Sequence, residues 1–309
     1  MTEEDQKSFY VDEIRKLHFE MISRPHVHKN ISSLLDNVRY YHELIGIPLA
    51  EEIRLAEKKL KGKSKNYLTR VSGGHDAKLG FFPFIAGLRI TLINGKASVC
   101  GASLVTLTRL VTAAHCWKDS SYKAISMLVV LGSLSIFIKE KSGQSVSTSD
   151  VVVHPNFDAQ KILNDVAVIR LKNKVKITKT VQVVRLPTRN MLEKTFEEYR
   201  AYIAGFGRMS SNSIVDSHVR LGYKKIKVIG NEKCKDYYGD VLKPTYICAG
   251  APDGAACRGD SGGPLAYKTK SQYYLIGVSS FGPLDCGESS APSVFSRITS
   301  YIDWIQKQL

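Results

Sequence analysis

Residues 257–264 read CRGDSGGP, and the prediction of the fold starts from them. Arg258, Gly259 and Asp260 spell an adhesion tripeptide, which would place the Asp260 side chain exposed on a loop tip. The glycines around Ser261 also form the frame of a nucleophilic serine, in which Asp260 would be buried and paired. The two interpretations require opposite environments for Asp260, so the rest of the chain has to decide between them.

A serine hydroxyl is a poor nucleophile unless an oriented base accepts its proton. LVTAAHCW (110–117) places His115 at the end of an apolar strand, and NDVAVIRL (164–171) places Asp165 at the start of another. A lone histidine there is more often structural, and a lone aspartate before a strand is usually a cap or turn residue. Both occur here with a framed serine, in the chain order His, Asp, Ser. α/β-hydrolases run Ser, Asp, His with a helix after the serine, whereas Pro264 and a β-like run follow Ser261, which excludes that class.

Composition and cysteine content indicate a globular protein from an oxidising compartment. The 309 residues are 43% hydrophobic, enough for one large or two modest cores. No apolar run approaches the roughly 18–20 residues of a membrane-spanning helix. The N-terminal sequence MTEEDQKSFYVDEIRK is acidic and polar, unlike an export signal. Six cysteines without metal-ligand spacing indicate disulfides, so we predict a secreted protein. No export leader is visible, which a truncated or misannotated start would explain, and this tension stays open.

The chain divides into a helical part and a β-rich part. Residues 8–62 carry apolar residues at helical spacing, in the runs 11–22, 31–45 and 48–61. Residues 61–70 form a basic stretch without periodicity that is typical of an exposed, protease-sensitive linker. From Val71 onward short β-branched and aromatic runs alternate with turn residues. We expect strands within 84–93, 102–114, 124–132, 165–171, 201–206, 273–281 and 292–298, and a C-terminal helix at about 298–309.

The formal net charge of +15 bears on which partners the protein could bind. Residues 1–70 carry 13 Lys and Arg against 11 Asp and Glu, so +13 of the net charge lies in the β-rich part. Such a field favours polyanions, although lysines scattered over exposed faces for solubility are the more common explanation. No zinc finger, RNP-like aromatic pattern or basic zipper indicates nucleic-acid binding.

Residues 71–309 resemble the chymotrypsin-like (trypsin-fold) serine proteases, and within them the insect chymotrypsin and brachyurin (collagenase-like) branch. The matching motifs are RVSGG (70–74), TAAHC (112–116), NDVA (164–167), GDSGGP (259–264), SSFG (279–282) and the SRITSYIDWI ending with Trp304. The resemblance implies an all-β fold of two six-stranded antiparallel β-barrels with a C-terminal helix, preceded by a mainly helical propeptide, residues 1–70. It also implies three disulfides, Cys100–Cys116, Cys234–Cys248 and Cys257–Cys286.

The resemblance assigns each candidate residue a role. Ser261 would attack the scissile carbonyl, His115 would act as base and then acid, and Asp165 would hold the imidazole tautomer. The backbone N–H groups of Gly259 and Ser261 would form the oxyanion hole. Cleavage after Arg70 would free the α-amino group of Val71 to pair with a buried Asp260, so the adhesion interpretation is rejected.

The resemblance also places the specificity pocket. Its base would be Ala255 beside Ala256, and its walls would be Ser280, Phe281, Gly282 and, opposite, Ser293. Ala255 offers no carboxylate for Arg or Lys, and a buried unpaired guanidinium is costly. We therefore expect cleavage after Phe, Tyr, Leu or Met, with Ala or Val as the elastase-like alternative.

Several expectations about partners follow. Protein and peptide substrates are expected, with serpins or other protease inhibitors as further partners. Because activation requires a cut after Arg70, we expect a separate trypsin-like protease to perform it. Glu140 is the only acid in the loop 133–149, too few oxygen ligands for calcium, so no metal or cofactor is expected. The alternatives left open are a polyanion-binding homologue with little activity, and a permanent N-terminal helical domain in place of a propeptide.

Overall fold

The protein is described here by a computed structural model that covers residues 31–60, 75–207, 220–250, 256–257, 259–283 and 291–309. The chain separates into two compact units, residues 1–33 and residues 34–309, and the second holds both β-sheets. Within the described ranges, no helix is both long and apolar enough to cross a membrane. The expected helix at 11–22, Arg70, Val71, Ala255 and Cys286 lie outside the described residues.

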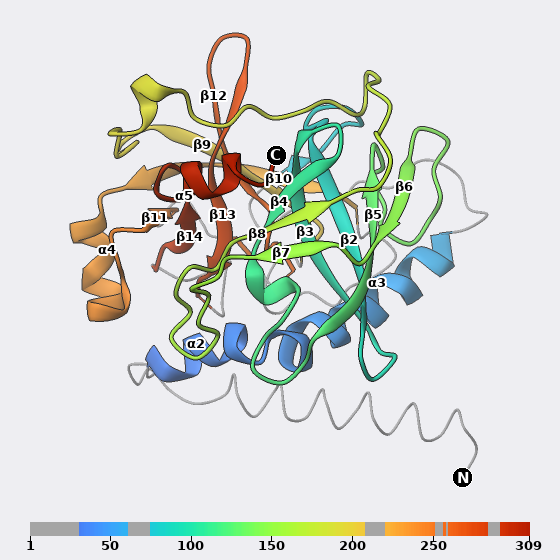
Figure 1. Ribbon diagram of the computed structural model, residues 1–309, viewed down its shortest axis with the longest axis horizontal. Coiled ribbons are helices and arrows are strands. Elements are labelled where there is room, and N and C mark those ends of the chain that lie inside the picture. The colour runs from blue at the N-terminus through green and yellow to red at the C-terminus, as the bar shows by residue number, and fades with distance from the viewer. Residues whose placement is uncertain (1–30, 61–74, 208–219, 251–255, 258, 284–290) are drawn as a thin grey trace. The chain divides into compact units, whose positions relative to one another are not determined.

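The first sheet closes into a barrel of six strand positions (Figure 1). Its order is β6-β5-β2-β3-β4-β8-β7. The end strands β6 and β7 are neighbours in the chain, separated only by Ser149 and Asp150, so one interrupted strand pairs with β5 at one end and β8 at the other. The bounds are β2 (Ile85–Leu92), β3 (Ala97–Thr106), β4 (Arg109–Thr112), β5 (Ala124–Leu131), β6 (Gln144–Thr148), β7 (Val151–Val153) and β8 (Ala167–Arg170).

The second sheet also closes on six strands. Its order is β1-β10-β11-β14-β13-β12-β9, and an additional pairing of β10 with β9 completes the ring. β1 contributes only two pairs at one end of β10 and lies outside that ring. The bounds are β1 (His75–Asp76), β9 (Arg200–Gly205), β10 (Gly222–Ile229), β11 (Tyr246–Ala249), β12 (Pro264–Lys268), β13 (Tyr273–Phe281) and β14 (Ser293–Arg297).

Branched and aromatic side chains fill each barrel, as expected for strands buried on one face. Leu88, Leu104 and Leu110 are fully buried in the first, and Ile276 and Phe295 in the second. The expected C-terminal helix is α5 (Ile298–Gln306), with its apolar face buried, and a further helix, α4 (Asn231–Tyr238), carries Cys234. The predicted all-β architecture is confirmed.

Residues 34–60 belong to the same compact unit as the barrels. They fold as α2 (Ile31–Arg39), a π-helical turn η1 (His42–Gly46) and α3 (Ile47–Leu60), which agrees with the expected helical runs. One face of this segment is buried throughout, and its apolar members are Leu35, Val38, Tyr41, Ile45, Leu49, Ala50, Ile53 and Ala56. The periodicity therefore predicted the helices, and their apolar face is buried in the structure.

Candidate active site

The first element of the site is a buried histidine–aspartate pair. β4 ends at Thr112 and a 3-10 turn, η2 (Ala114–Cys116), turns His115 inward. His115 Nδ1 lies 2.7 Å from Asp165 Oδ2, and the His115 backbone N–H donates to Asp165 Oδ1 at 2.9 Å. Both side chains are fully buried. The double contact fixes the position and the rotation of the carboxylate relative to the ring.

Two serines from the second barrel complete the surroundings of Asp165. Ser280 Oγ donates to Asp165 Oδ2 at 2.6 Å, and Ser296 Oγ donates to the Asp165 carbonyl at 2.7 Å. Burial alone would raise the pKa of Asp165, but the charge of His115 and hydrogen bonds from His115 and Ser280 outweigh it, and the pKa is lowered. Asp165 is therefore held as a carboxylate that can stabilise a positive imidazole.

Ser261 lies on a tight turn between Gly259 (φ +97°) and Gly262 (φ +76°), backbone conformations that favour glycine. The Gly101 N–H donates to the Ser261 carbonyl at 2.8 Å, which joins the turn to the first barrel. The Ser261 side chain interacts with the Tyr41 hydroxyl, and this interaction partly opposes the rise that burial causes in the Tyr41 pKa. Within the described part of the chain, His115 Nε2 has no hydrogen-bond partner. The structure thus brings serine, histidine and aspartate together without a serine–histidine hydrogen bond.

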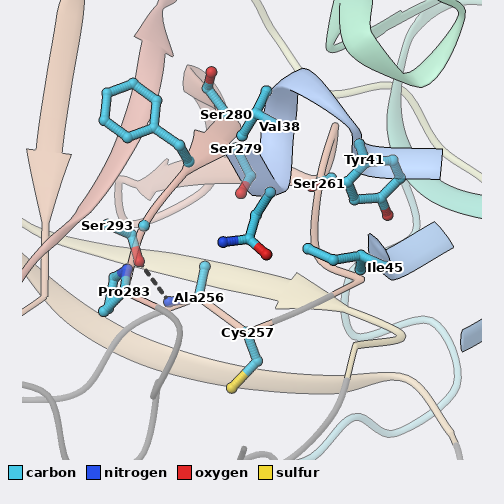
Figure 2. Close-up of a pocket in the computed structure, with 13 residues that line it drawn as sticks. Val38, Tyr41, Ile45, Ala256, Cys257, Ser261, Ser279, Ser280, Pro283 and Ser293 are labelled. Carbon is cyan, nitrogen blue, oxygen red and sulfur yellow. Dashed lines mark hydrogen bonds between the residues drawn. The ribbon is translucent and has the colours of Figure 1, made fainter. Parts of the chain in front are cut away.

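A pocket opens beside Ser261 (Figure 2). Ser293 Oγ accepts the Ala256 N–H at 2.8 Å across it, and a Cβ placed on Gly282 would lie 3.1 Å from Ser293 Oγ. None of the described residues that line the pocket is an acid. The lining residues are Asn37, Val38, Tyr41, Ile45, Ala256, Cys257, Ser261, Ser279, Ser280, Phe281, Gly282, Pro283 and Ser293.

Asp260 is 8% exposed, as the nucleophile interpretation requires and the adhesion interpretation forbids. Its two oxygens accept the backbone N–H groups of Gly207 at 3.0 Å and Cys257 at 2.9 Å. Burial raises the pKa of Asp260 to about 6, and these two hydrogen bonds only partly oppose the rise. An ammonium group brought to this carboxylate would pair with a buried charge.

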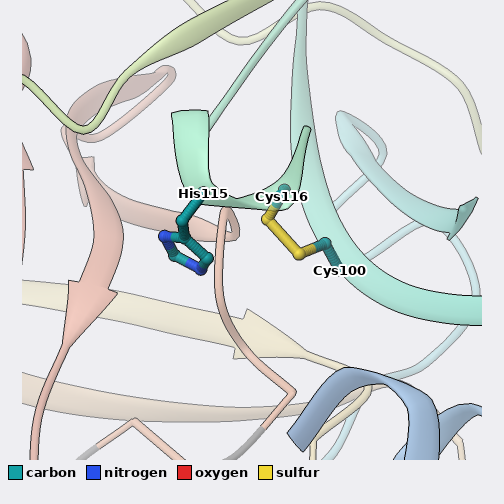
Figure 3. A group of neighbouring side chains, drawn as sticks. All are labelled: Cys100, His115 and Cys116. Atoms are coloured by element: carbon teal, nitrogen blue, oxygen red, sulfur yellow. A yellow bond between two sulfur atoms is a disulfide. The ribbon is translucent and has the colours of Figure 1, made fainter. Parts of the chain in front are cut away.

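The cysteine pairs form in short neighbouring stretches. Cys100–Cys116 and Cys234–Cys248 are disulfides, as the resemblance implies. Cys257 is also disulfide-bonded, and its expected partner Cys286 lies outside the described residues. The sulfurs of Cys100 and Cys116 lie within 4.8 Å of a His115 ring nitrogen, but the S–S bond between them uses both as covalent partners (Figure 3). This cluster therefore offers no thiolate ligands to a metal.

The sequence did not indicate that residues 34–60 reach the active site. The Tyr41 ring lies 4.8 Å from the His115 ring between centroids. A Cβ on Gly259 would lie 2.2 Å from Leu49 Cδ2, so Leu49 packs directly against the backbone of that glycine. An amphipathic pattern that contains two adjacent tyrosines was the only sequence signal, and amphipathicity is shared by any core helix.

Comparison with known proteins gives consistent matches. The family model described as Trypsin matches residues 71–305. The collagenase of Hypoderma lineatum is 37% identical over 241 residues, 77% of this chain and 86% of the relative. Chymotrypsin-C of Bos taurus is 31% identical over 249 residues, 79% of this chain and 90% of the relative. A solved structure named HL collagenase matches with a TM-score of 0.67 at 36% identity, covering 76% of this chain and 96% of that chain.

Proposed function

Because this chain belongs to the trypsin family of serine proteases and is a serine endopeptidase, we propose that it is the secreted precursor of a chymotrypsin-like enzyme. Residues 1–70 serve as the propeptide, and residues 71–309 are the protease domain. The family match begins at Val71, the residue that follows the proposed cleavage site. The observation that carries the proposal is the buried His115–Asp165 pair beside Ser261 at the mouth of a pocket.

The proposed chemistry follows from the positions of these groups. Ser261 attacks the scissile carbonyl and forms the acyl-enzyme, while His115 Nε2 accepts its proton and later passes it to the leaving amine. Asp165 holds His115 through Nδ1 and stays ionised because its pKa is lowered. The N–H groups of Gly259 and Ser261 stabilise the oxyanion, and loss of one such donor typically costs about 100- to 1,000-fold in kcat.

The proposed specificity is for a large apolar or aromatic residue before the scissile bond. Small side chains on Ala256 and Gly282 leave room for such a residue, and the described lining carries no carboxylate for Arg or Lys. Ser293 stands against Gly282 and narrows the slot, which is the observation in favour of an elastase-like preference for Ala or Val. The extended backbone of Ser280–Gly282 pairs with the substrate as an added strand.

Activation is proposed to require a separate trypsin-like protease. The cut after Arg70 frees the Val71 ammonium, which pairs with Asp260 and orders the pocket. Asp260 is already buried and has a raised pKa, so an incoming ammonium gains a strong partner. A pocket without a carboxylate does not favour Arg70 as a substrate residue, so the purified precursor should remain uncleaved on its own.

Peptide hydrolysis after cleavage before Val71 tests the proposal. The panel carries Phe, Leu, Ala and Arg before the scissile bond, with the Ser261→Ala protein as control and the activating protease removed. Turnover of the Phe or Leu peptide, absent from the control, is the expected result. Preference for Ala would favour the elastase-like alternative. No turnover at any dilution, with Val71 verified as the new N-terminus, would favour a homologue that binds polyanions through its basic surface.

A further inference from the structure

Residues 34–57, called the cleft segment below, contact each functional part of the candidate active site. Asn37 and Val38 line the same pocket as Ala256 and Ser293, and Figure 2 shows Val38 among the lining residues. Tyr41 contacts the catalytic pair, Leu49 packs on Gly259, and Glu57 binds a neighbouring loop. The segment is therefore placed where a substrate would have to bind.

Tyr41 contacts both the proposed nucleophile and its base. Its side chain is fully buried, its hydroxyl donates to the Val99 carbonyl at 2.8 Å, and its ring lies against His115. The single hydrogen of the Tyr41 hydroxyl goes to Val99, so toward the neighbouring Ser261 side chain this hydroxyl can act only as an acceptor. His115 Nε2 has no hydrogen-bond partner among the described residues.

The cleft segment has the wrong backbone conformation to be cut as a substrate. The Tyr40 N–H donates to the Asp36 carbonyl and the Leu44 N–H to the Tyr40 carbonyl, both at 2.9 Å, as in a helix. A substrate of this enzyme class would instead lie extended along Ser280–Gly282. A helical chain presents no scissile carbonyl in line with the nucleophile, so the segment blocks the site without being consumed.

Polar contacts of Glu57 and His42 anchor the cleft segment. Glu57 is 1% exposed, and its carboxylate accepts the backbone N–H groups of Ile136, Phe137 and Ile138 at 2.8, 2.8 and 2.6 Å. The His42 N–H donates to Asp119 Oδ2 at 2.7 Å, next to the catalytic turn. These contacts are all made to the protease domain and none involves the linker 61–70.

No covalent bond would hold the segment after activation, because residues 1–70 contain no cysteine. The contacts described above do not depend on an intact peptide bond at Arg70. We propose that the cleft segment is a helical inhibitor that remains bound to the protease after cleavage before Val71 and that also inhibits other molecules of the mature enzyme as a separate chain. This inference rests on the proposed function, and it makes dissociation or destruction of the segment a second step of activation.

The test uses the full chain with residues 66–70 replaced by Asp-Asp-Asp-Asp-Lys, so that enteropeptidase cuts before Val71 and spares the cleft segment. After cleavage, the N-terminal fragment should co-elute with residues 71–309 in gel filtration at micromolar concentration. Activity per molecule should rise at least about tenfold on dilution, as mass action releases the fragment. Separation of the two chains at micromolar concentration, or activity independent of dilution, would overturn the inference.

A synthetic peptide of residues 31–60 provides the test in trans. Added to the diluted, active enzyme, it should restore inhibition, whereas the same peptide with Tyr41→Ala should inhibit at least about 100-fold less well. A peptide with Leu55→Ala is the matched control, because Leu55 is 42% exposed on α3, and it should inhibit like the natural sequence. Equal inhibition by all three peptides, or by none, would contradict the inference.

The two proposals fail in different ways. If no form of the cleaved protein hydrolyses any peptide, the proposed function is wrong, and co-elution of the fragment still decides whether the segment binds. If the cleaved protein is fully active at every concentration, the proposed function holds and the inhibitor inference is wrong.

Discussion

The side chain of Tyr41 contacts both Ser261 and His115, and His115 Nε2 has no hydrogen-bond partner among the described residues. The Tyr41 ring lies 4.8 Å from the His115 ring between centroids. Asp165 and His115 are already in contact at 2.7 Å. The histidine–aspartate pair is therefore already assembled, and Tyr41 lies against it.

Two substitutions of Tyr41 should distinguish the contribution of its ring to inhibition from that of its hydroxyl. In the enteropeptidase-cleaved protein, Tyr41→Phe removes the hydrogen bond to Val99 and the polar contact with Ser261, and it should weaken inhibition by about 5- to 30-fold, for a loss of about 1–2 kcal/mol. Tyr41→Ala removes the ring as well and should weaken inhibition by more than about 100-fold, since truncation of a buried aromatic costs about 3–5 kcal/mol. The measurement is the inhibition constant from dilution series, with Leu55→Ala as control. Equal effects of Phe and Ala would mean that the ring packing contributes nothing.

Binding of the cleft segment should weaken as the pH falls below about 6.5. Burial, together with the nearby His115, lowers the pKa of His42 to about 3. His42 in the free segment takes up a proton near about pH 6.5, whereas His42 in the bound segment does not. The affinity of the segment for the protease is therefore highest above about pH 6.5, and below that pH it falls by up to about tenfold per pH unit.

The groups that face His42 are Ser98, which contacts Nδ1 at 2.9 Å, Asp119, Tyr41 and His115. Burial raises the pKa of Asp119 and of Glu57 despite their hydrogen bonds. Protonation of these two carboxyl groups therefore favours binding of the segment, whereas protonation of His42 opposes it. The dissociation constant should therefore be compared between the natural segment and His42→Asn at each pH. A ratio that does not change between pH 7 and pH 5 would exclude His42 as the titrating group.

Asp260 should make the uncleaved precursor less stable as the pH rises. The pKa of Asp260 is raised to about 6 in the folded protein, above the usual value for aspartate, so the protonated carboxyl stabilises the fold. This contribution to the free energy of unfolding is complete below about pH 4 and is lost as the pH rises through about 6. The loss amounts to about 3 kcal/mol over that window. Urea unfolding of the uncleaved Ser261→Ala precursor from pH 4 to 7, with and without Asp260→Asn, measures it. Parallel pH curves for the two proteins would show that Asp260 is not the source.

Ser280 should act as a positioning residue for the triad. Its hydroxyl is one of the groups that lower the pKa of Asp165, so Ser280→Ala should move the acid limb of the kcat/KM profile to higher pH. A hydrogen bond to a charged group is worth about 1.5–3 kcal/mol, so kcat should fall by about tenfold or more. Ser279→Ala on the same strand is the matched control and should leave the acid limb in place. A drop in activity without a shift of that limb would indicate a structural effect only.

Much of the site could be predicted from the sequence because its chemistry is carried by short local motifs. The strands that hold His115 and Asp165, and the glycine turn around Ser261, are encoded within a few residues of each side chain. The disulfides Cys100–Cys116 and Cys234–Cys248 also join neighbouring stretches. The contacts of Ser280 and Ser296 with Asp165 could not be read in this way, because they join residues more than a hundred positions apart.

The sequence by itself determined that the chain carries a trypsin-family protease domain and that residues 31–60 are helical, since both depend on motifs and periodicity along the chain. Only the tertiary structure decided where the apolar face of those helices lies. An amphipathic pattern specifies that one face must be buried and does not specify against what. The surface that buries Tyr41 and Leu49 is assembled from Val99, His115, Gly259 and Ser261, which come from both barrels and meet only when the chain has folded.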